Sequence, residues 1–433
     1  MASRTDATLA TDALSHAELA SCFAAARCLS LDLAAPLSDA DASAQSMADA
    51  SPAKWHLAHT SWFFETFVLR DHVSGYQPFD PRYAYLFNSY YEAEGPRHAR
   101  PQRGLLTRPS LDEVRDWRAH VDAAVQEVLP DLSDAGRALI ELGIHHEQQH
   151  QELLLTDIKH LFAQNPLGPA AWDADRPRNC APQPPDSPGR GRGDTMRWIE
   201  GAEGIVSVGH AGEAFAFDCE SPLFSLLLYP HALASRPVTN EEWQAFIDDG
   251  GYHISSLWLS DGWEWVKAEG VEAPLYWDEG RVFTLAGWQP IDPAAPVTHI
   301  SFYEADAFAS WAGARLPTEF EWEAAAAPLD PLGGQQLDQA GPVQPAAALG
   351  ERGLAQMFGS VWEWTGSAYR PYPGFRPAPG AVGEYNGKFM SGQFVLRGGS
   401  CATPRGHVRA SYRNFFYPHQ RWQFTGVRLA KDL

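Results

Sequence analysis

The chain has 433 residues, of which 45% are hydrophobic and 12% aromatic. Its length and composition are those of a globular protein with two or three domains, and they exclude a single small module. Lys and Arg total 33 against 54 Asp and Glu, which gives a formal net charge of −21. Because such an acidic surface repels phosphate groups, we expect neither nucleic acid nor a membrane as a partner.

The sequence shows no membrane span, since no window reaches roughly 18 to 20 uninterrupted apolar residues. The N-terminal segment has no basic region followed by an apolar stretch, and we therefore expect a cytoplasmic protein. The cysteines are Cys22, Cys28, Cys180, Cys219 and Cys401. Because they form no CxxC pair, we expect buried reduced thiols rather than a disulfide framework or a zinc–thiolate site. The sequence leaves the oligomeric state open.

Residues 12–164 are predicted to form an all-α four-helix bundle of up-and-down topology. Ser15, followed three residues later by a glutamate, indicates a capping box, and Ser51, followed by a proline, predicts the start of a second helix. Residues 111–129 have apolar side chains at helical spacing. Ser133 is a suitable N-cap for a long fourth helix.

The composition changes after the bundle. Residues 165–195 are dominated by Pro, Gly, Asp and Arg, which predicts a linker or a long wrapping loop. Residues 196–433 are rich in Trp, Gly and short apolar runs between turn signals, with clear helical patterns over 239–248 and 302–312. We therefore expect a multidomain chain in which an α+β domain with much irregular structure follows the bundle.

The fourth predicted helix carries two histidines in a row of leucines. His146 and His150 are four residues apart on one helical face, directed into the bundle, and can therefore bind one metal ion. In the second helix, His56 or His59 can complete a three-histidine site, and helical phase favours His59. Three neutral imidazoles with open positions suit iron, zinc or copper, and the residues alone do not decide which. Ordinary hydrogen-bonded core histidines are the alternative.

The sequence HEQQH at residues 146–150 also matches the HExxH motif. In that motif two histidines bind zinc and the glutamate, here Glu147, acts as the general base of peptide hydrolysis. The motif is short, no HxxGxxH extension follows, and the second domain would have no role. A zinc hydrolase or thiol transferase is therefore the second hypothesis.

The segment between the second and third predicted helices is rich in tyrosine and arginine. Its tyrosines are Tyr83, Tyr85, Tyr90 and Tyr91, and its arginines are Arg97, Arg100, Arg103 and Arg108. Phenols near a metal can donate protons or hydrogen-bond to bound oxygen. In so acidic a protein, a basic cluster can hold a substrate carboxylate by forked hydrogen bonds. A packed loop with solvated arginines is the alternative.

With these motifs in order, the chain resembles the iron-dependent sulfoxide synthases of ergothioneine biosynthesis over nearly its whole length. The segments WHLAH and HHEQQHQE are similar to those of a DinB-like bundle. The segments RPVTNEEWQAF, GSVWEWTGS, LRGGS and FTGVRLA are similar to a formylglycine-generating-enzyme (sulfatase-modifying factor) domain, whose fold is C-type-lectin-like.

The resemblance implies an Fe(II) ion on His59, His146 and His150, with O2 as co-substrate. This family joins sulfur to the imidazole ring of hercynine, the trimethylated betaine of histidine, and oxidises that sulfur to a sulfoxide. The two steps remove four electrons, which matches full reduction of O2, and the chain has no nicotinamide or flavin motif. The sulfur donor is cysteine or γ-glutamylcysteine, and the NSYY sequence looks more like the branch that uses cysteine.

The resemblance also implies residue roles. Tyr90 and Tyr91 fall where one branch of the family has active-site tyrosines, one of which is the expected proton donor to the iron–oxygen intermediate. Arg100 and Arg103 are candidates for binding the carboxylate of the sulfur donor. Hercynine needs aromatic faces and amides for its cation and carboxylate, and the candidates are Gln149, Asn414, Phe415 and Phe416. The active site would then lie between the domains.

One feature departs from the formylglycine-generating enzymes. They bind copper through a cysteine pair after the RGGS segment, whereas this chain has only Cys401 there, so we expect that chemistry to be absent. Three other functions stay open: joining selenium to hercynine (the selenoneine type), joining sulfur to histidine (the ovothiol type), and ligand binding without catalysis by the C-type-lectin-like domain.

Overall fold

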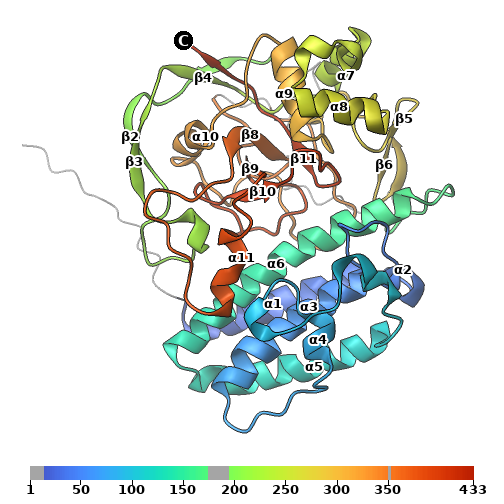
Figure 1. Cartoon of the computed structure of the whole chain (residues 1–433), viewed down its shortest axis with the longest axis vertical. Helices are drawn as coiled ribbons and strands as arrows, with labels where there is room; N and C mark the ends of the chain where they lie inside the picture. Colours follow the sequence, from blue (N-terminus) through green and yellow to red (C-terminus); the bar gives the residue numbers. More distant parts are fainter. Residues whose placement is uncertain (1–13, 174–194, 350–352) are drawn as a thin grey trace, which may run out of the picture.

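The computed structural model describes residues 14–173, 195–349 and 353–433. Figure 1 shows a group of helices from the N-terminal part lying against a β-rich second part, with the long helix α6 at their boundary. The predicted fold class, an all-α bundle followed by an α+β domain, is confirmed. No helix among the described residues is both long and apolar enough to span a membrane.

The bundle is built from four long helices. They are α1 (His16–Ala34), α3 (Ala53–Phe64), α5 (Leu111–Val128) and α6 (Asp134–Ala163). Helix α6 packs on α1 and α3, and α3 also packs on α5. Short pieces complete this part: α2 (Asp39–Ser43), α4 (Tyr83–Phe87), a π-helical continuation of α3 (Glu65–Arg70) and a 3-10 segment (Arg100–Leu105).

Serine caps start most of these helices, because a serine oxygen satisfies a backbone N–H that has no partner within the helix. The Ser15 hydroxyl accepts from the Glu18 amide in a capping box, as predicted, and Ser133 caps α6. The second helix begins where Ser51 and the following proline predict, but its N-cap is Pro52 rather than Ser51 and makes no side-chain hydrogen bond. The Ser51 hydroxyl instead accepts a hydrogen bond from Arg103.

The histidine row of α6 does not fill the centre of the bundle. That centre is formed by the neighbouring face of α6, where Ile140, Ile144 and Leu155 are buried in the core. His146 and His150 lie between α6 and α3 and line a pocket shared with the second domain. Since a 30-residue helix spans about 45 Å, α6 is long enough to contact both domains along its length.

The cysteine prediction is wrong for part of the chain. Cys219 and Cys401 are buried thiols, but Cys22 and Cys28 are exposed on α1. They lie on the solvent face of that helix, because its core face is occupied by residues such as Phe23. Cys180 lies outside the described residues.

The predicted linker is described only at its beginning, since 174–194 lie outside the described residues. The amides of Ala171 and Trp172 donate to the carbonyl oxygen of Leu285, and the Trp172 side chain is buried. The start of this segment therefore packs on the second domain.

The described residues of the second domain form four small sheets. A four-stranded sheet has the order β10-β9-β8-β11, two three-stranded sheets have the orders β1-β4-β12 and β5-β6-β7, and β2 pairs with β3. The strands are β1 (Trp198–Glu200), β2 (Gly204–Val208), β3 (Phe224–Leu228), β4 (His231–Ala234), β5 (Trp277–Asp278), β6 (Arg281–Thr284), β7 (Gly287–Pro290), β8 (Trp362–Ala368), β9 (Phe394–Arg397), β10 (Asn414–Phe416), β11 (Thr425–Gly426) and β12 (Ala430–Asp432).

The helices of the second domain include both predicted ones, observed as α7 (Asn240–Asp248) and α9 (Phe302–Trp311). Sequence analysis missed α8 (Ser260–Glu269), α10 (Glu319–Ala326) and the single-turn α11 (Glu384–Gly387). Helix α10 carries a recognisable signal, since Thr318 and Glu321 form a capping box.

Glu152 of α6 connects the two domains. Its buried carboxylate accepts hydrogen bonds from the Trp362 indole (2.7 Å), the Ser400 hydroxyl (2.6 Å) and the Thr403 hydroxyl (2.7 Å). Trp362 belongs to the GSVWEW segment, Ser400 ends the RGGS segment, and Thr403 follows it three residues later. Because a buried carboxylate without partners is costly, the contacts fix α6 against the central sheet and so place its histidines.

Candidate metal centre between the two domains

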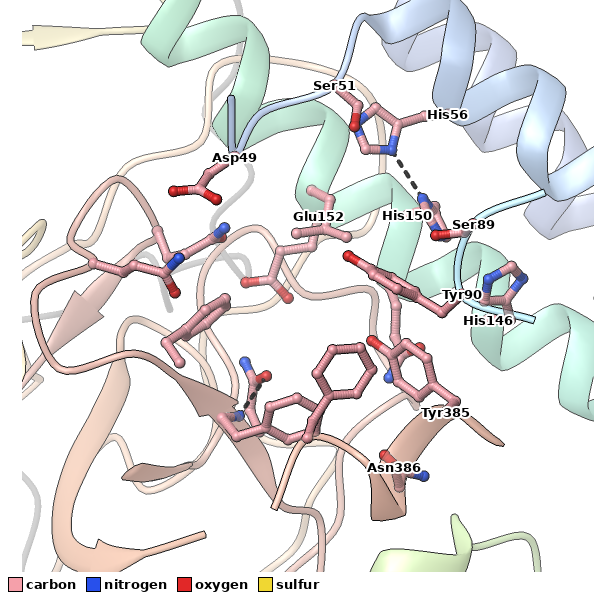
Figure 2. Close-up of a pocket in the computed structure, with 18 of the residues that line it drawn as sticks. Asp49, Ser51, His56, Ser89, Tyr90, His146, His150, Glu152, Tyr385 and Asn386 are labelled. Atoms are coloured by element: carbon pink, nitrogen blue, oxygen red, sulfur yellow. Dashed lines mark hydrogen bonds between the residues drawn. The ribbon is translucent and has the colours of Figure 1, made fainter. Parts of the chain in front are cut away.

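A cavity of about 190 Å³ lies between the bundle and the second domain. Its bundle side comes from α3, α6 and the segment 89–103, and its other side from α11 and the region around β10. Figure 2 shows Ser51, His56, Tyr90, His146, His150 and Glu152 facing Tyr385 and Asn386 across this space. All eleven predicted site residues line it: His59, Tyr90, Tyr91, Arg100, Arg103, His146, Gln149, His150 and the run 414–416.

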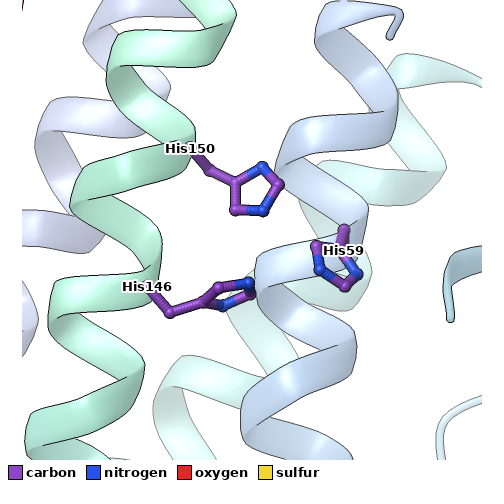
Figure 3. Close-up of side chains that lie close together, drawn as sticks. All are labelled: His59, His146 and His150. Carbon is purple, nitrogen blue, oxygen red and sulfur yellow. The ribbon is translucent and has the colours of Figure 1, made fainter. Parts of the chain in front are cut away.

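Three imidazoles meet at one end of the cavity. His59 of α3 and His146 and His150 of α6 turn their rings toward one another, and one ring nitrogen from each lies within 4.8 Å of the others (Figure 3). The His59 ring is stacked between two indoles, with centroids 4.6 Å from Trp55 and 5.4 Å from Trp62. Trp55 and Trp62, which lie four residues before and three residues after His59, therefore fix the plane of the His59 ring. The rings of His146 and His150 approach it from α6.

The hydrogen bonds of these rings leave nitrogen lone pairs free. His59 donates from Nδ1 to the carbonyl oxygen of Phe87 at 2.6 Å, so its Nε2 carries no proton in the neutral ring. The Nδ1 of His150 lies 2.8 Å from Nδ1 of His56. The buried Nδ1 of His146 has no hydrogen-bond partner among the described residues. The donor set therefore fits a metal ion, which requires deprotonated ring nitrogens.

Electrostatics favour the same neutral state. Burial lowers the pKa of His146 to about 4, and burial together with repulsion from neighbouring histidines lowers the pKa values of His59 and His150 well below their usual range. Neutral imidazole is the form that binds metal ions. At neutral pH these three residues are ready to act as ligands without first losing a proton.

His56 does not join the three-nitrogen cluster. Its Nδ1 faces the back of His150, and its Nε2 lies 3.0 Å from Oδ2 of Asp157 (Figure 2). The structure therefore brings His59, the residue that helical phase favours, together with His146 and His150, and places His56 behind the cluster.

Glu147 points away from the cavity. Its side chain accepts hydrogen bonds from Arg118, from Arg27 at 2.9 Å and from the Ser30 hydroxyl at 2.5 Å, all within the bundle core. Although burial opposes ionisation, the two arginines and the hydroxyl lower its pKa to about 2. A carboxylate in this position has no path to a metal-bound water, and this geometry disagrees with the hydrolase hypothesis.

The two tyrosines of the NSYY segment occupy different surroundings. Tyr90 accepts a hydrogen bond from Arg100, and its ring lies 5.0 Å from that of Phe389. Tyr91 packs against Trp62 and Phe67, and burial raises the pKa of its phenol. Tyr83 and Tyr85 do not line the cavity; Tyr83 is packed 4.8 Å from the ring of Trp117.

The two candidate arginines also differ. Arg100 donates to the Tyr90 hydroxyl and to a backbone oxygen of Asp49. Arg103 is buried, and its guanidinium contacts the hydroxyls of Ser51 and Ser89 rather than a carboxylate of the described residues. Arg97 and Arg108 do not reach the cavity, so only two of the four arginines in this segment can bind a ligand there.

The remaining candidates come from both sides of the cavity, since Gln149 belongs to α6 and residues 414–416 belong to the wall formed by the second domain. Gln149 donates to the Tyr412 hydroxyl at 2.8 Å, while the Phe415 ring is stacked 4.2 Å from Tyr369. Sequence analysis missed several residues of this wall, which are Tyr385, Phe389, His407, Tyr412 and Trp422. They belong to loops and short strands without a periodic pattern, so no spacing in the sequence identifies them.

Comparison with known proteins agrees with the two-domain architecture described above. Residues 23–154 match the DinB superfamily, and residues 184–339 and 334–433 match the sulfatase-modifying factor enzyme 1-like domain. The chain is 34% identical to hercynine oxygenase of Mycolicibacterium thermoresistibile over 416 residues, covering 88% of each chain. It is 35% identical to hercynine oxygenase of Mycobacterium tuberculosis over 409 residues, covering 88% of this chain and 91% of that one.

The chain belongs to the hercynine oxygenase family. A further relative is the ergothioneine biosynthesis protein 1 of Schizosaccharomyces pombe, 29% identical over 232 residues, which cover 50% of this chain and 28% of that protein. The family and the two-domain architecture that the motifs predict are thereby confirmed. In the hercynine oxygenase framework, the three-histidine cluster lies where the DinB-like and sulfatase-modifying-factor-like domains meet.

Proposed function

We propose that this protein is an Fe(II)- and O2-dependent sulfoxide synthase. It joins the sulfur of cysteine, or of γ-glutamylcysteine, to the imidazole ring of hercynine. The reaction balances as thiol plus imidazole C–H plus O2 giving the coupled sulfoxide plus one water. The thiol and the ring carbon each lose a hydrogen, one oxygen atom enters the sulfoxide, and the other leaves as water.

The observation that carries this proposal is the open three-histidine cluster at the domain boundary of a hercynine oxygenase family member. The ligand residues are His59, His146 and His150. Bound Fe(II) supplies the redox chemistry with O2 and leaves coordination positions for substrates, because the protein contributes only three ligands. The residues around it then bind, orient and protonate the reactants.

The wall formed by the second domain suits hercynine. The aromatic rings of Phe415 and Phe416 offer π faces to a trimethylammonium group, which has no N–H to donate. The amide groups of Asn414 and Gln149 provide hydrogen bonds for polar atoms of the substrate. This wall binds the cation without a buried countercharge, which would be costly when the site is empty.

Arg103 is the proposed partner for the carboxylate of the sulfur donor. It is 3% exposed, faces the cavity, and has no ion pair among the described residues. A carboxylate arriving with the substrate would supply that missing countercharge through a charge-assisted hydrogen bond. Arg100 flanks it and holds Tyr90.

Tyr90 is the proposed proton donor. Its oxygen already accepts a hydrogen bond from Arg100, so its own hydrogen is available for donation into the cavity. Tyr91 is held in an aromatic cluster with Trp62 and Phe67 and acts as packing for the ligand helix.

The test is a direct assay of the coupled product. The protein is loaded with Fe(II) without oxygen, mixed with hercynine and cysteine, exposed to O2, and analysed by mass spectrometry. A parallel reaction contains γ-glutamylcysteine, and matched reactions contain histidine or selenocysteine in place of one substrate. The proposal predicts a hercynylcysteine sulfoxide that requires iron and O2. Binding of iron without coupling in any mixture would contradict it.

The buried position of Glu147 argues against the hydrolase hypothesis. A zinc hydrolase needs a carboxylate near the metal-bound water, and Glu147 is held by Arg27 and Arg118 on the opposite side of α6. Peptidase activity of the zinc-loaded protein would revive that hypothesis, and we expect none.

A further inference from the structure

Three side chains, Asp157, His56 and His150, form a hydrogen-bonded series that ends at the three-histidine cluster. Oδ2 of Asp157 lies 3.0 Å from Nε2 of His56, and Nδ1 of His56 lies 2.8 Å from Nδ1 of His150. Asp157 and His56 are both buried. Figure 2 shows the His56 ring behind His150, with the contact between them drawn. His56 touches His150 on the side of the ring that bears Nδ1, which leaves Nε2 for the metal.

The direction of these hydrogen bonds follows from the surroundings of Asp157. Its Oδ2 also accepts from the Ser51 amide at 2.7 Å, and its Oδ1 accepts from the Trp422 indole at 3.2 Å. An ionised carboxylate only accepts hydrogen bonds, so the His56 Nε2 carries a proton and donates it. In neutral His56 the Nδ1 is then an acceptor. The partner nitrogen, Nδ1 of His150, must be the donor.

This arrangement selects the tautomer of His150 that can bind a metal through Nε2. We propose that Asp157 and His56 are positioning residues that fix the orientation and tautomer of His150. The inference rests on the proposed function, because it assumes that His150 is a metal ligand. Neither residue touches the metal or the reacting atoms, so both act through His150.

The three ligands are thus held in different ways. His59 is oriented by the backbone oxygen of Phe87, and Nδ1 of His146 has no partner among the described residues. Of the three, only His150 is oriented by a hydrogen-bonded series of side chains. This series also reaches the second domain, since the Trp422 indole donates to Oδ1 of Asp157. Docking of the second domain and orientation of His150 therefore depend on the same carboxylate.

The inference predicts that metal affinity falls when the hydrogen bonds between Asp157, His56 and His150 are removed. Removing a partner of a metal-bound histidine lowers metal affinity about 10- to 100-fold. We expect such a loss in His56→Ala. In His56→Asn the side-chain oxygen occupies nearly the position of Nδ1 and accepts from His150, so this variant should recover most of the affinity. Asp157→Leu should resemble His56→Ala, because it removes the oxygen that accepts the hydrogen bond from Nε2 of His56.

The experiment uses the full chain, with Fe(II) and Co(II) affinities measured without oxygen by competition with a chelator. The matched control is His160→Ala, because His160 is also on α6 but contacts Ser46, away from the cluster. Thermal unfolding of the metal-free variants shows whether each is folded. If His56→Ala is unfolded, the comparison of His56→Asn with Asp157→Leu replaces it, and near-wild-type affinity is expected only for the first.

A second readout separates positioning from a merely structural role. In the Co(II) protein, the N–H protons of coordinated imidazoles give shifted, exchangeable NMR signals. The His150 signal should exchange with solvent much faster in His56→Ala, while the His59 signal, bonded to Phe87, should not change. Wild-type affinity and unchanged exchange in His56→Ala would overturn the inference while leaving the ligand assignment intact. Absence of metal binding by the wild-type protein would overturn both.

Discussion

The guanidinium carbon of Arg103 lies 3.3 Å from the centroid of the Trp55 ring. Trp55 is itself stacked on His59, so an arginine, an indole and a candidate metal ligand form one continuous stack. Burial, followed by repulsion from Arg100, lowers the pKa of Arg103 to about 9. A buried cation without a countercharge is unfavourable, and this one faces a cavity that an anionic substrate can enter.

Arg103→Met should therefore weaken binding of the sulfur donor. A hydrogen bond to a charged group is worth about 1.5–3 kcal/mol, so we expect KM for cysteine to rise about 10- to 100-fold with a smaller change in kcat. KM for cysteamine, which has no carboxylate, should be the same in both proteins. Arg97→Met is the control, because Arg97 pairs with Glu92 outside the cavity. Equal cysteine KM values in Arg103→Met and the wild type would contradict the assignment.

Tyr90→Phe should slow the coupled reaction without loss of metal. Proton donation by a positioned side chain typically contributes a factor of about 100 or more, so we expect a decrease of that order and a shift from sulfoxide toward oxidised thiol. Tyr91→Phe is the matched control, since its ring packs against Trp62 and would remain in place. The measurement is the ratio of the two products by mass spectrometry. A larger effect in Tyr91→Phe would exchange the two roles.

Local chemistry explains which parts of the fold could be predicted from the sequence. Ser15 and Ser133 cap helices through contacts within three residues, and the spacing of His146 and His150 places them on one helical face wherever the helix packs. Ser51 has the same local pattern, but its hydroxyl and amide are used by Arg103 and Asp157, which are distant in sequence. Tertiary contacts overrode the local signal there.

The rest of the site depends on contacts that no local pattern contains. His56 and Asp157 are separated by 101 positions, and their pairing appears only once α3 and α6 are packed. Tyr385 and Trp422 reach the cavity from segments of the second domain without helical or strand periodicity. The sequence therefore predicted the histidines on α3 and α6 that the fold brings together, and it could not predict most of the wall opposite them.

Glu147→Gln should lower the free energy of unfolding without removing a group that takes part in catalysis. The change leaves buried Arg118 without a countercharge and Arg27 paired only with Asp122, which costs about 3 kcal/mol or more. Urea unfolding of the metal-free protein measures this loss. Asp112→Asn is the control, because its pair with Arg115 is exposed and should contribute less than about 1 kcal/mol. Wild-type stability combined with lost turnover would instead favour a catalytic role for Glu147.

Lys159→Met should stabilise the protein and remove part of its pH dependence. Lys159 is fully buried, 2.6 Å from Nε2 of His299, and lies over the rings of Tyr276 and Phe424. Burial lowers its pKa from 10.5 to about 7. Between these values the unfolded chain holds a proton that the folded protein has released, so stability rises as pH increases from 7 to 10.5 and changes no further below pH 7, where both states hold the proton.

Methionine has a similar length and no charge, so the variant should be more stable than the wild type by roughly 2–4 kcal/mol at or below pH 7. The difference should shrink as pH rises toward 10.5, because the wild-type lysine is then neutral in both states. Urea unfolding at several pH values gives the difference directly. Lys267→Met, which removes an exposed lysine paired with Glu264, should show no such trend. A constant difference across this range would mean that Lys159 keeps its proton when buried, with its charge balanced inside the fold.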